Sequence, residues 1–171
     1  AVADKIDVLF TAWDEECGFY SLSDYEQVKV IYDYICENVV YDYDNLLNLN
    51  YTLKYSAYAA LINGTAVCQG YANLFYRMAL AAGLDCRIVT GIGNGDRHAW
   101  NIVKIDGAYY LVDSTWDEGV APKSYRWFLK GTAGFPDHAM DTDFQTGDFA
   151  ASYPISAANY DPVANCEHDD V

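Results

Sequence analysis

A two-residue turn signal constrains this chain more than any other local feature. Asp106-Gly107 separates residues 98–105 from residues 108–112, and both flanking runs are rich in β-branched and aromatic residues. Asp-Gly between two such runs predicts a hairpin with a two-residue turn, because both residues tolerate the positive φ that this turn requires. A turn there pairs residues whose numbers sum to 106 + 107, or 213. We therefore expect an antiparallel sheet in the middle of the chain.

Helical periodicity precedes this hairpin. A capping box occupies residues 23–26, and apolar residues then recur at spacings of three and four over residues 24–39. The same spacing predicts a second helix over residues 68–82, with Gly83 where a C-cap glycine belongs. Residues 55–62 favour a short helix. Helices followed by antiparallel strands predict an α+β fold, with the helices packed against the sheet.

The remaining segments carry weaker patterns. Residues 86–90 predict a short strand, residues 91–96 a flexible glycine-rich loop, and residues 125–129 a further strand. A length of 171 residues fits one domain, which we expect over residues 1–158, followed by a tail or linker over residues 159–171.

Charge and hydropathy exclude several classes of partner. The chain has 10 basic and 25 acidic residues, for a net charge of −15. A surface this acidic repels phosphate, so we expect neither nucleic acid nor an anionic membrane as partner. No apolar run approaches the roughly 18 residues that span a bilayer, so we expect no membrane insertion. The 16 tyrosines and the acidic balance favour an extracellular or cell-surface setting.

The five cysteines do not form a metal-binding or redox pattern. Their spacing contains no C-x-x-C pair, which argues against a zinc ribbon or a thioredoxin-like site. Cys36 and Cys86 lie on apolar faces and are expected to be buried. Cys17 and Cys166 lie near the two ends of the chain, and a disulfide between them stays open.

Three other residues stand at the edges of predicted elements. Cys68 begins a helix, where the partial positive charge of the helix end favours a thiolate. His98 opens the first hairpin strand, and Asp113 ends the second, about two residues from the position that would face His98. A thiolate could attack an acyl carbon while the imidazole moves the proton and the carboxylate fixes the imidazole tautomer. The Cys68 N–H could bind the developing oxyanion, with Asn63 as a candidate second donor.

Other candidate ligands are rejected. His138 is interpreted as a surface residue. Asp141 and Asp143 are spaced as in some calcium loops, but they lack the further oxygen ligands and the turn glycine of such a loop. With three histidines and no H-E-x-x-H motif, a metal hydrolase is disfavoured, and we expect neither a metal nor a cofactor.

Three sequence blocks carry a resemblance to a known family. They read GTAVCQGYA over residues 64–72, HAWN over residues 98–101 and VDSTWD over residues 112–117. In order and spacing, with 30 residues from Cys to His and 15 from His to Asp, the chain resembles the transglutaminase-like superfamily. The resemblance implies a papain-like core and a catalytic triad of Cys68, His98 and Asp113.

The resemblance is nearest to the bacterial secreted or cell-surface type. The zinc-binding cysteine pairs of the related peptide N-glycanases are missing, which weighs against deglycosylation. The calcium-dependent multidomain animal enzymes are much longer, so calcium regulation is not carried over.

Together these features predict cysteine-dependent acyl transfer or hydrolysis on protein or peptide amides. A thioester on Cys68 would be resolved by an amine or by water, giving transamidation, deamidation or proteolysis. Trp100 and Trp116 are expected to wall a substrate slot, unless they are core residues, and Gln69 is expected to contact substrate. The alternative is a non-catalytic binding or structural module of a larger multidomain surface protein, since a papain-like scaffold can also hold a partner.

Overall fold

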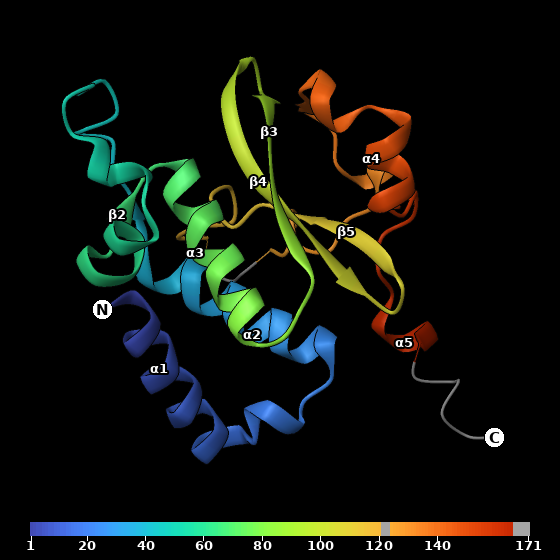
Figure 1. Cartoon of the computed structure of the whole chain (residues 1–171), viewed down its shortest axis with the longest axis horizontal. Helices are drawn as coiled ribbons and strands as arrows, with labels where there is room; N and C mark the ends of the chain where they lie inside the picture. The colour runs from blue at the N-terminus through green and yellow to red at the C-terminus, as the bar shows by residue number, and fades with distance from the viewer. Residues whose placement is uncertain (121–123, 166–171) are drawn as a thin grey trace.

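The computed structural model describes residues 1–120 and 124–165, in which helices come first and an antiparallel sheet follows (Figure 1). The helices are α1 (Val2–Cys17), α2 (Asp24–Asn38), α3 (Cys68–Ala81), α4 (Gly147–Ser152) and α5 (Pro162–Asn165). The strands are β1 (Val40–Tyr41), β2 (Thr65–Ala66), β3 (Cys86–Gly93), β4 (Asp96–Ile105), β5 (Ala108–Val112) and β6 (His138–Met140). The predicted α+β class is thereby confirmed.

The main sheet has four strands in the order β5-β4-β3-β6, all antiparallel. Asp106 and Gly107 form the tight turn between β4 and β5, with φ of 49° and 88°. Asn101 pairs with Val112 and Ile105 with Ala108, so the register has the predicted sum of 213. The ladder stops at Val112, and the strand neighbour of His98 is Gly91 on β3 rather than a residue near position 115.

The two predicted helices are confirmed. Ser23 caps α2 by accepting a hydrogen bond from the Glu26 N–H, and the Glu26 carboxylate accepts one from the Ser23 N–H in return. Gly83 follows α3 with φ of 84°, as a glycine after a helix end commonly does. Residues 55–62, predicted as a short helix, contain the end of a 3₁₀ turn at Thr52–Tyr55 and most of a π turn at Ala59–Asn63. Helix α1 was not predicted, because Ile6 and Phe10 are its only fully buried side chains and give a narrow apolar stripe.

Two local predictions are wrong. Residues 91–93 are not loop: β3 continues to Gly93, and a two-residue turn at Asn94-Gly95 leads directly into β4. The glycines there serve close packing, because a Cβ at Gly91 would collide with the Ala139 carbonyl on β6. Residues 125–129 form turns instead of a strand, and Lys130 makes a single bridge to Leu111.

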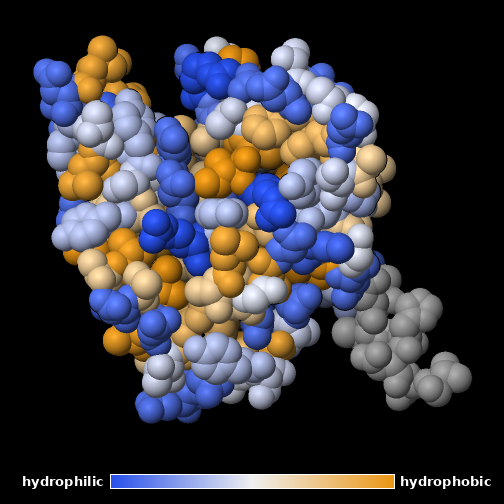
Figure 2. Space-filling view, in the orientation of Figure 1, coloured by the Kyte–Doolittle hydropathy of each residue, from blue (hydrophilic) through white to orange (hydrophobic). Residues whose placement is uncertain are grey.

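The sheet separates two apolar cores. Helices α2 and α3 cover one face, where Val103 and Ile105 of β4 pack into the larger core. Trp100 and Ile102 alternate to the other face and pack in a smaller core with Trp127 and Phe135. A hollow of about 370 Å³ adjoins this smaller core, and its apolar lining includes residues of α4. Figure 2 shows apolar side chains gathered between the sheet and α4.

The predicted tail contacts the rest of the domain at its start. The Asn159 carboxamide oxygen accepts the Gly131 N–H, and Tyr160 stacks on Tyr25.

Cys36 and Cys86 are buried as predicted. Cys17 is exposed, and Cys166 lies outside the described residues, so their pairing stays an open prediction. No helix in the described part of the chain has the length and apolarity to cross a membrane.

Candidate active site

Cys68 is the first residue of α3, as expected for a nucleophile at a helix N-terminus. The extended backbone of Val67 leads into the helix from β2, and the Val67 N–H donates to the Lys54 carbonyl. Gly70 permits this close entry, because a Cβ there would lie 2.7 Å from that carbonyl oxygen. The side chain of Cys68 is half-buried, so the sulfur is placed at the edge of the core rather than sealed within it.

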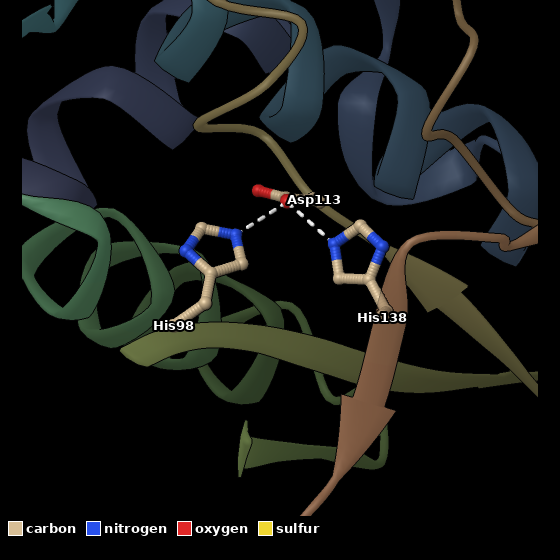
Figure 3. Close-up of side chains that lie close together, drawn as sticks. All are labelled: His98, Asp113 and His138. Carbon is tan, nitrogen blue, oxygen red and sulfur yellow. Dashed lines mark hydrogen bonds and ion pairs between the residues drawn. The ribbon is translucent and has the colours of Figure 1, made fainter. Parts of the chain in front are cut away.

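His98 and Asp113 meet as the hairpin predicts, although not as cross-strand partners. Nε2 of His98 lies 2.6 Å from Oδ2 of Asp113 (Figure 3). Burial alone would lower the pKa of His98, but hydrogen bonds to Asp113 and to Cys68 outweigh it and raise the pKa to about 9. The imidazole therefore favours its protonated form, and it lines the same hollow as Cys68.

The side chain of Asp113 is buried, and both of its carboxylate oxygens have hydrogen-bond partners. Its side chain is 1% exposed, and its Oδ1 accepts the backbone N–H groups of Thr115 and Trp116 at 3.0 and 3.4 Å. Burial favours the neutral acid, yet hydrogen bonds from His138 and His98 lower the pKa of Asp113 below its ordinary value. The carboxylate is therefore held both ionised and fixed in direction.

His138 is the functional residue that sequence reasoning missed. It begins β6, its side chain is only 2% exposed, and its Nε2 lies 3.0 Å from Oδ2 of Asp113 (Figure 3). The prediction of a surface histidine is wrong, because pairing of β6 with the glycine-bearing end of β3 turns this side chain inward. A three-residue edge strand leaves no periodic signal, so nothing local in the sequence identified it.

Among the residues that the structure describes, His98, Asp113 and His138 form a donor set that could hold a metal ion, with ligand atoms within 4.8 Å of one another. Ligands at about 2.0–2.1 Å in a tetrahedral zinc site lie roughly 3.3 Å apart. The nitrogen-to-oxygen distances of 2.6 and 3.0 Å are shorter than that and match hydrogen bonds. The arrangement is therefore that of an imidazole–carboxylate network.

The three expected substrate contacts fall into different environments. The Trp116 ring is half-buried and stacks on His98 with centroids 5.0 Å apart, so it borders the site. Trp100 is 1% exposed and packs in the smaller core against His98 and His138, and it contributes to the lining of the 370 Å³ hollow. Gln69 is exposed and lines the hollow that contains Cys68. Substrate contact by Trp116 and Gln69 stays a prediction.

A hollow of about 270 Å³ opens over Cys68 and His98, and Tyr41, Val67 and Gln69 contribute to its lining. Parallel pairing of β1 with β2 places Tyr41 beside Ala66, two residues before the nucleophile position. Burial, and to a smaller extent the negative charge of the Cys68 thiolate, raises the pKa of Tyr41 to about 12. A hydrogen bond between the Tyr41 hydroxyl and the Cys68 backbone acts in the opposite direction. The exposed Asn63 ends the preceding π turn, and its role as a second oxyanion donor stays a prediction.

The sequence matches the family model of the transglutaminase-like superfamily over residues 17–114, more than half of the chain. This chain therefore belongs to that superfamily. The matched segment contains Cys68, His98 and Asp113, whereas His138 lies beyond its end.

Particular relatives are similar over part of their length. The chain is 34% identical over 110 residues to mouse kyphoscoliosis peptidase and 33% identical over 110 residues to the human protein, covering 57% of this chain and 16% of each relative. Among solved structures, a TGase matches with a TM-score of 0.59 at 23% identity, covering 75% of this chain and 36% of that one. A candidate cysteine protease from Cytophaga hutchinsonii matches with a TM-score of 0.51 at 25% identity, covering 64% and 37%.

Proposed function

We propose that this protein is a cysteine-dependent enzyme that transfers or hydrolyses acyl groups of protein or peptide amides, with Cys68, His98 and Asp113 as its catalytic residues. The observation that carries the proposal is the arrangement of three side chains: a half-buried Cys68 at the start of α3, His98 in the lining of the same hollow, and an Asp113 carboxylate oxygen 2.6 Å from the His98 ring. The relatives named as a peptidase, a cysteine protease and a TGase support the same chemistry.

In the first step the Cys68 thiolate attacks the amide carbonyl carbon and a carbon–sulfur bond forms. The carbon–nitrogen bond then breaks, and the departing amine or ammonia takes the proton of the His98 imidazolium. In the second step an amine or water attacks the thioester, gives its proton back to His98 and releases the Cys68 thiolate. Asp113 keeps the imidazole oriented throughout.

The acceptor decides the product, because the same three residues serve transamidation, deamidation and proteolysis. We propose an extracellular or cell-surface setting, on the acidic and tyrosine-rich composition.

The test is incubation of the full chain with glutamine-containing peptides and a tagged primary amine, read by mass spectrometry. A tagged peptide indicates transamidation, replacement of a side-chain amide by a carboxylate indicates deamidation, and a shortened peptide indicates proteolysis. Cys68→Ala is the matched control and should give none of these while keeping the fold.

Product formation by Cys68→Ala at the wild-type rate would refute the proposal. If the wild type forms no product with any of these substrates, the pH profile of Cys68 alkylation decides. A profile like that of a free thiol, which ionises near about pH 8.5, would favour the non-catalytic binding module.

A further inference from the structure

A second histidine reaches the Asp113 carboxylate from the side opposite His98 (Figure 3). Nε2 of His138 lies 3.0 Å from the same Oδ2 that lies 2.6 Å from Nε2 of His98. A carboxylate oxygen has two lone-pair directions, so it can accept both N–H bonds. The proposed function uses His98 and Asp113, and it leaves this third member of the cluster without a role.

The other ring nitrogen of His138 also faces an acceptor. Its Nδ1 lies 3.1 Å from the backbone oxygen of Pro136. A neutral imidazole carries one N–H, so one of the two facing oxygens would meet a lone pair. The bond to Asp113 requires that a hydrogen lie on Nε2, the nitrogen that faces the carboxylate.

Aromatic side chains enclose the ring of His138. Its ring centroid lies 4.0 Å from that of Phe135, 4.2 Å from Trp116 and 4.9 Å from Trp100. Such an enclosure shields the ring from water and strengthens its attraction to the carboxylate.

Few charges face this ring. Asp113 and His98 are its ionisable neighbours across the site. On its own segment, Asp137 precedes it and is exposed, and Asp141 beyond β6 is paired with Arg97. Asp113 is therefore the charged group to which His138 is hydrogen-bonded.

We propose that His138 is a positioning residue, which holds Asp113 ionised and aimed at His98 during the reaction. The proposal rests on the function proposed above. When His98 gives its proton to the leaving group, it stops being a cation, and the buried carboxylate loses its nearest compensating charge. Burial then favours protonation of Asp113, which would release His98. The second N–H bond, from His138, keeps the carboxylate charged at that stage.

Three variants separate this role from simple packing. His138→Phe keeps an aromatic ring of similar size and removes both N–H groups. His138→Gln keeps a side-chain N–H donor and is the conservative variant. Phe135→Leu is the matched control, because it loosens the packing around the His138 ring and leaves the bond to Asp113 in place.

The readout is the rate of Cys68 alkylation by iodoacetamide between about pH 4 and pH 10, followed on the Cys68 peptide by mass spectrometry. The wild type should react well below neutral pH, through the thiolate–imidazolium pair. In His138→Phe, the pH range in which the alkylation rate falls on acidification should lie about one unit higher, so that the rate near pH 6 falls about tenfold. His138→Gln should recover part of this shift. Phe135→Leu should lower the melting temperature without changing the pH dependence of alkylation.

A wild-type alkylation profile in a folded His138→Phe protein would overturn the proposal. Should that variant fail to fold, nitrogen-15 NMR of the unmodified protein decides, since the chain has only three histidines and single variants assign them. A hydrogen on Nε2 of the His138 ring is expected, and a bare Nε2 would contradict the role. A free-thiol profile in the wild type refutes the proposed function instead and leaves the NMR result to judge the bond from His138 to Asp113.

Discussion

At the scale of single residues, one carboxylate organises the site. Asp113 accepts two backbone N–H bonds on Oδ1 and two histidine bonds on Oδ2, so neither oxygen is left to water. The sequence predicts Cys68, His98 and Asp113 as site residues because each stands at the edge of a predictable element, and the structure brings His98 and Asp113 together. It did not identify His138, because its approach to Asp113 depends on a chain path that no local pattern encodes.

Asp113→Asn should lower turnover by at least about 100-fold while the protein keeps its fold. An asparagine presents one acceptor and one N–H₂ group where four donors now converge, so either the two histidines or the two backbone N–H groups lose their acceptor. Activity on the peptide and amine mixture measures the loss. Asp141→Asn is the control, because that carboxylate bonds Arg97 and Thr90 without contacting His98. Equal activity of the two variants would argue against the role of Asp113.

At the scale of elements, the helices with wide apolar faces and the Asp106-Gly107 hairpin were predictable, and the glycine-rich end of β3 was misread. Glycines often mark loops, but in a strand they also mark a close approach of other groups. Gly91 admits the backbone of β6, and Gly93 admits the ring of His98. The sequence gives the positions of the glycines, but it does not give the groups that pack against them. This segment is therefore predicted as a loop.

Gly93→Ala should lower turnover by about 10- to 100-fold with only a modest loss of stability. The added Cβ would lie 2.8 Å from Cδ2 of the His98 ring, so the imidazole must move away. Kinetics on the peptide substrates, together with a urea melt, separate the two effects. Gly95→Asn is the matched control, because that position meets open space and asparagine tolerates its φ of 92° better than most residues. Wild-type activity of Gly93→Ala would show that this glycine does not set the ring position.

At the scale of the whole molecule, the sheet carries the site between two cores. One core joins the sheet to α2 and to α3, whose first residue is Cys68, and the other joins it to the segment that supplies His138. The class of fold followed from the order of helices and strands. The second core did not, since the side chains that cover the strands on that face, among them Trp127 and Phe135, lie in turns and short elements far along the chain.

The free energy of unfolding should fall as the pH rises from about 6.5 to about 9, by up to about 3 kcal/mol. The pKa of His98 is raised from 6.5 to about 9 in the folded chain. A raised pKa gives its full stabilisation below the unfolded value, and the stabilisation is lost as the pH passes the folded value. Urea melts at several pH values measure this. His98→Gln should flatten the slope in this window, and an unchanged slope would contradict the assignment.

The family match stops at residue 114, but β6 and its ladder to β3 lie further on. A recombinant fragment trimmed to that boundary would encode nucleophile, imidazole and carboxylate, and yet leave Oδ2 with a single donor and the outer edge of β3 uncovered. A fragment that keeps the contact between His138 and Asp113 and the ladder of β6 to β3 must therefore extend at least through Met140, and gene boundaries for expression should be chosen on that basis.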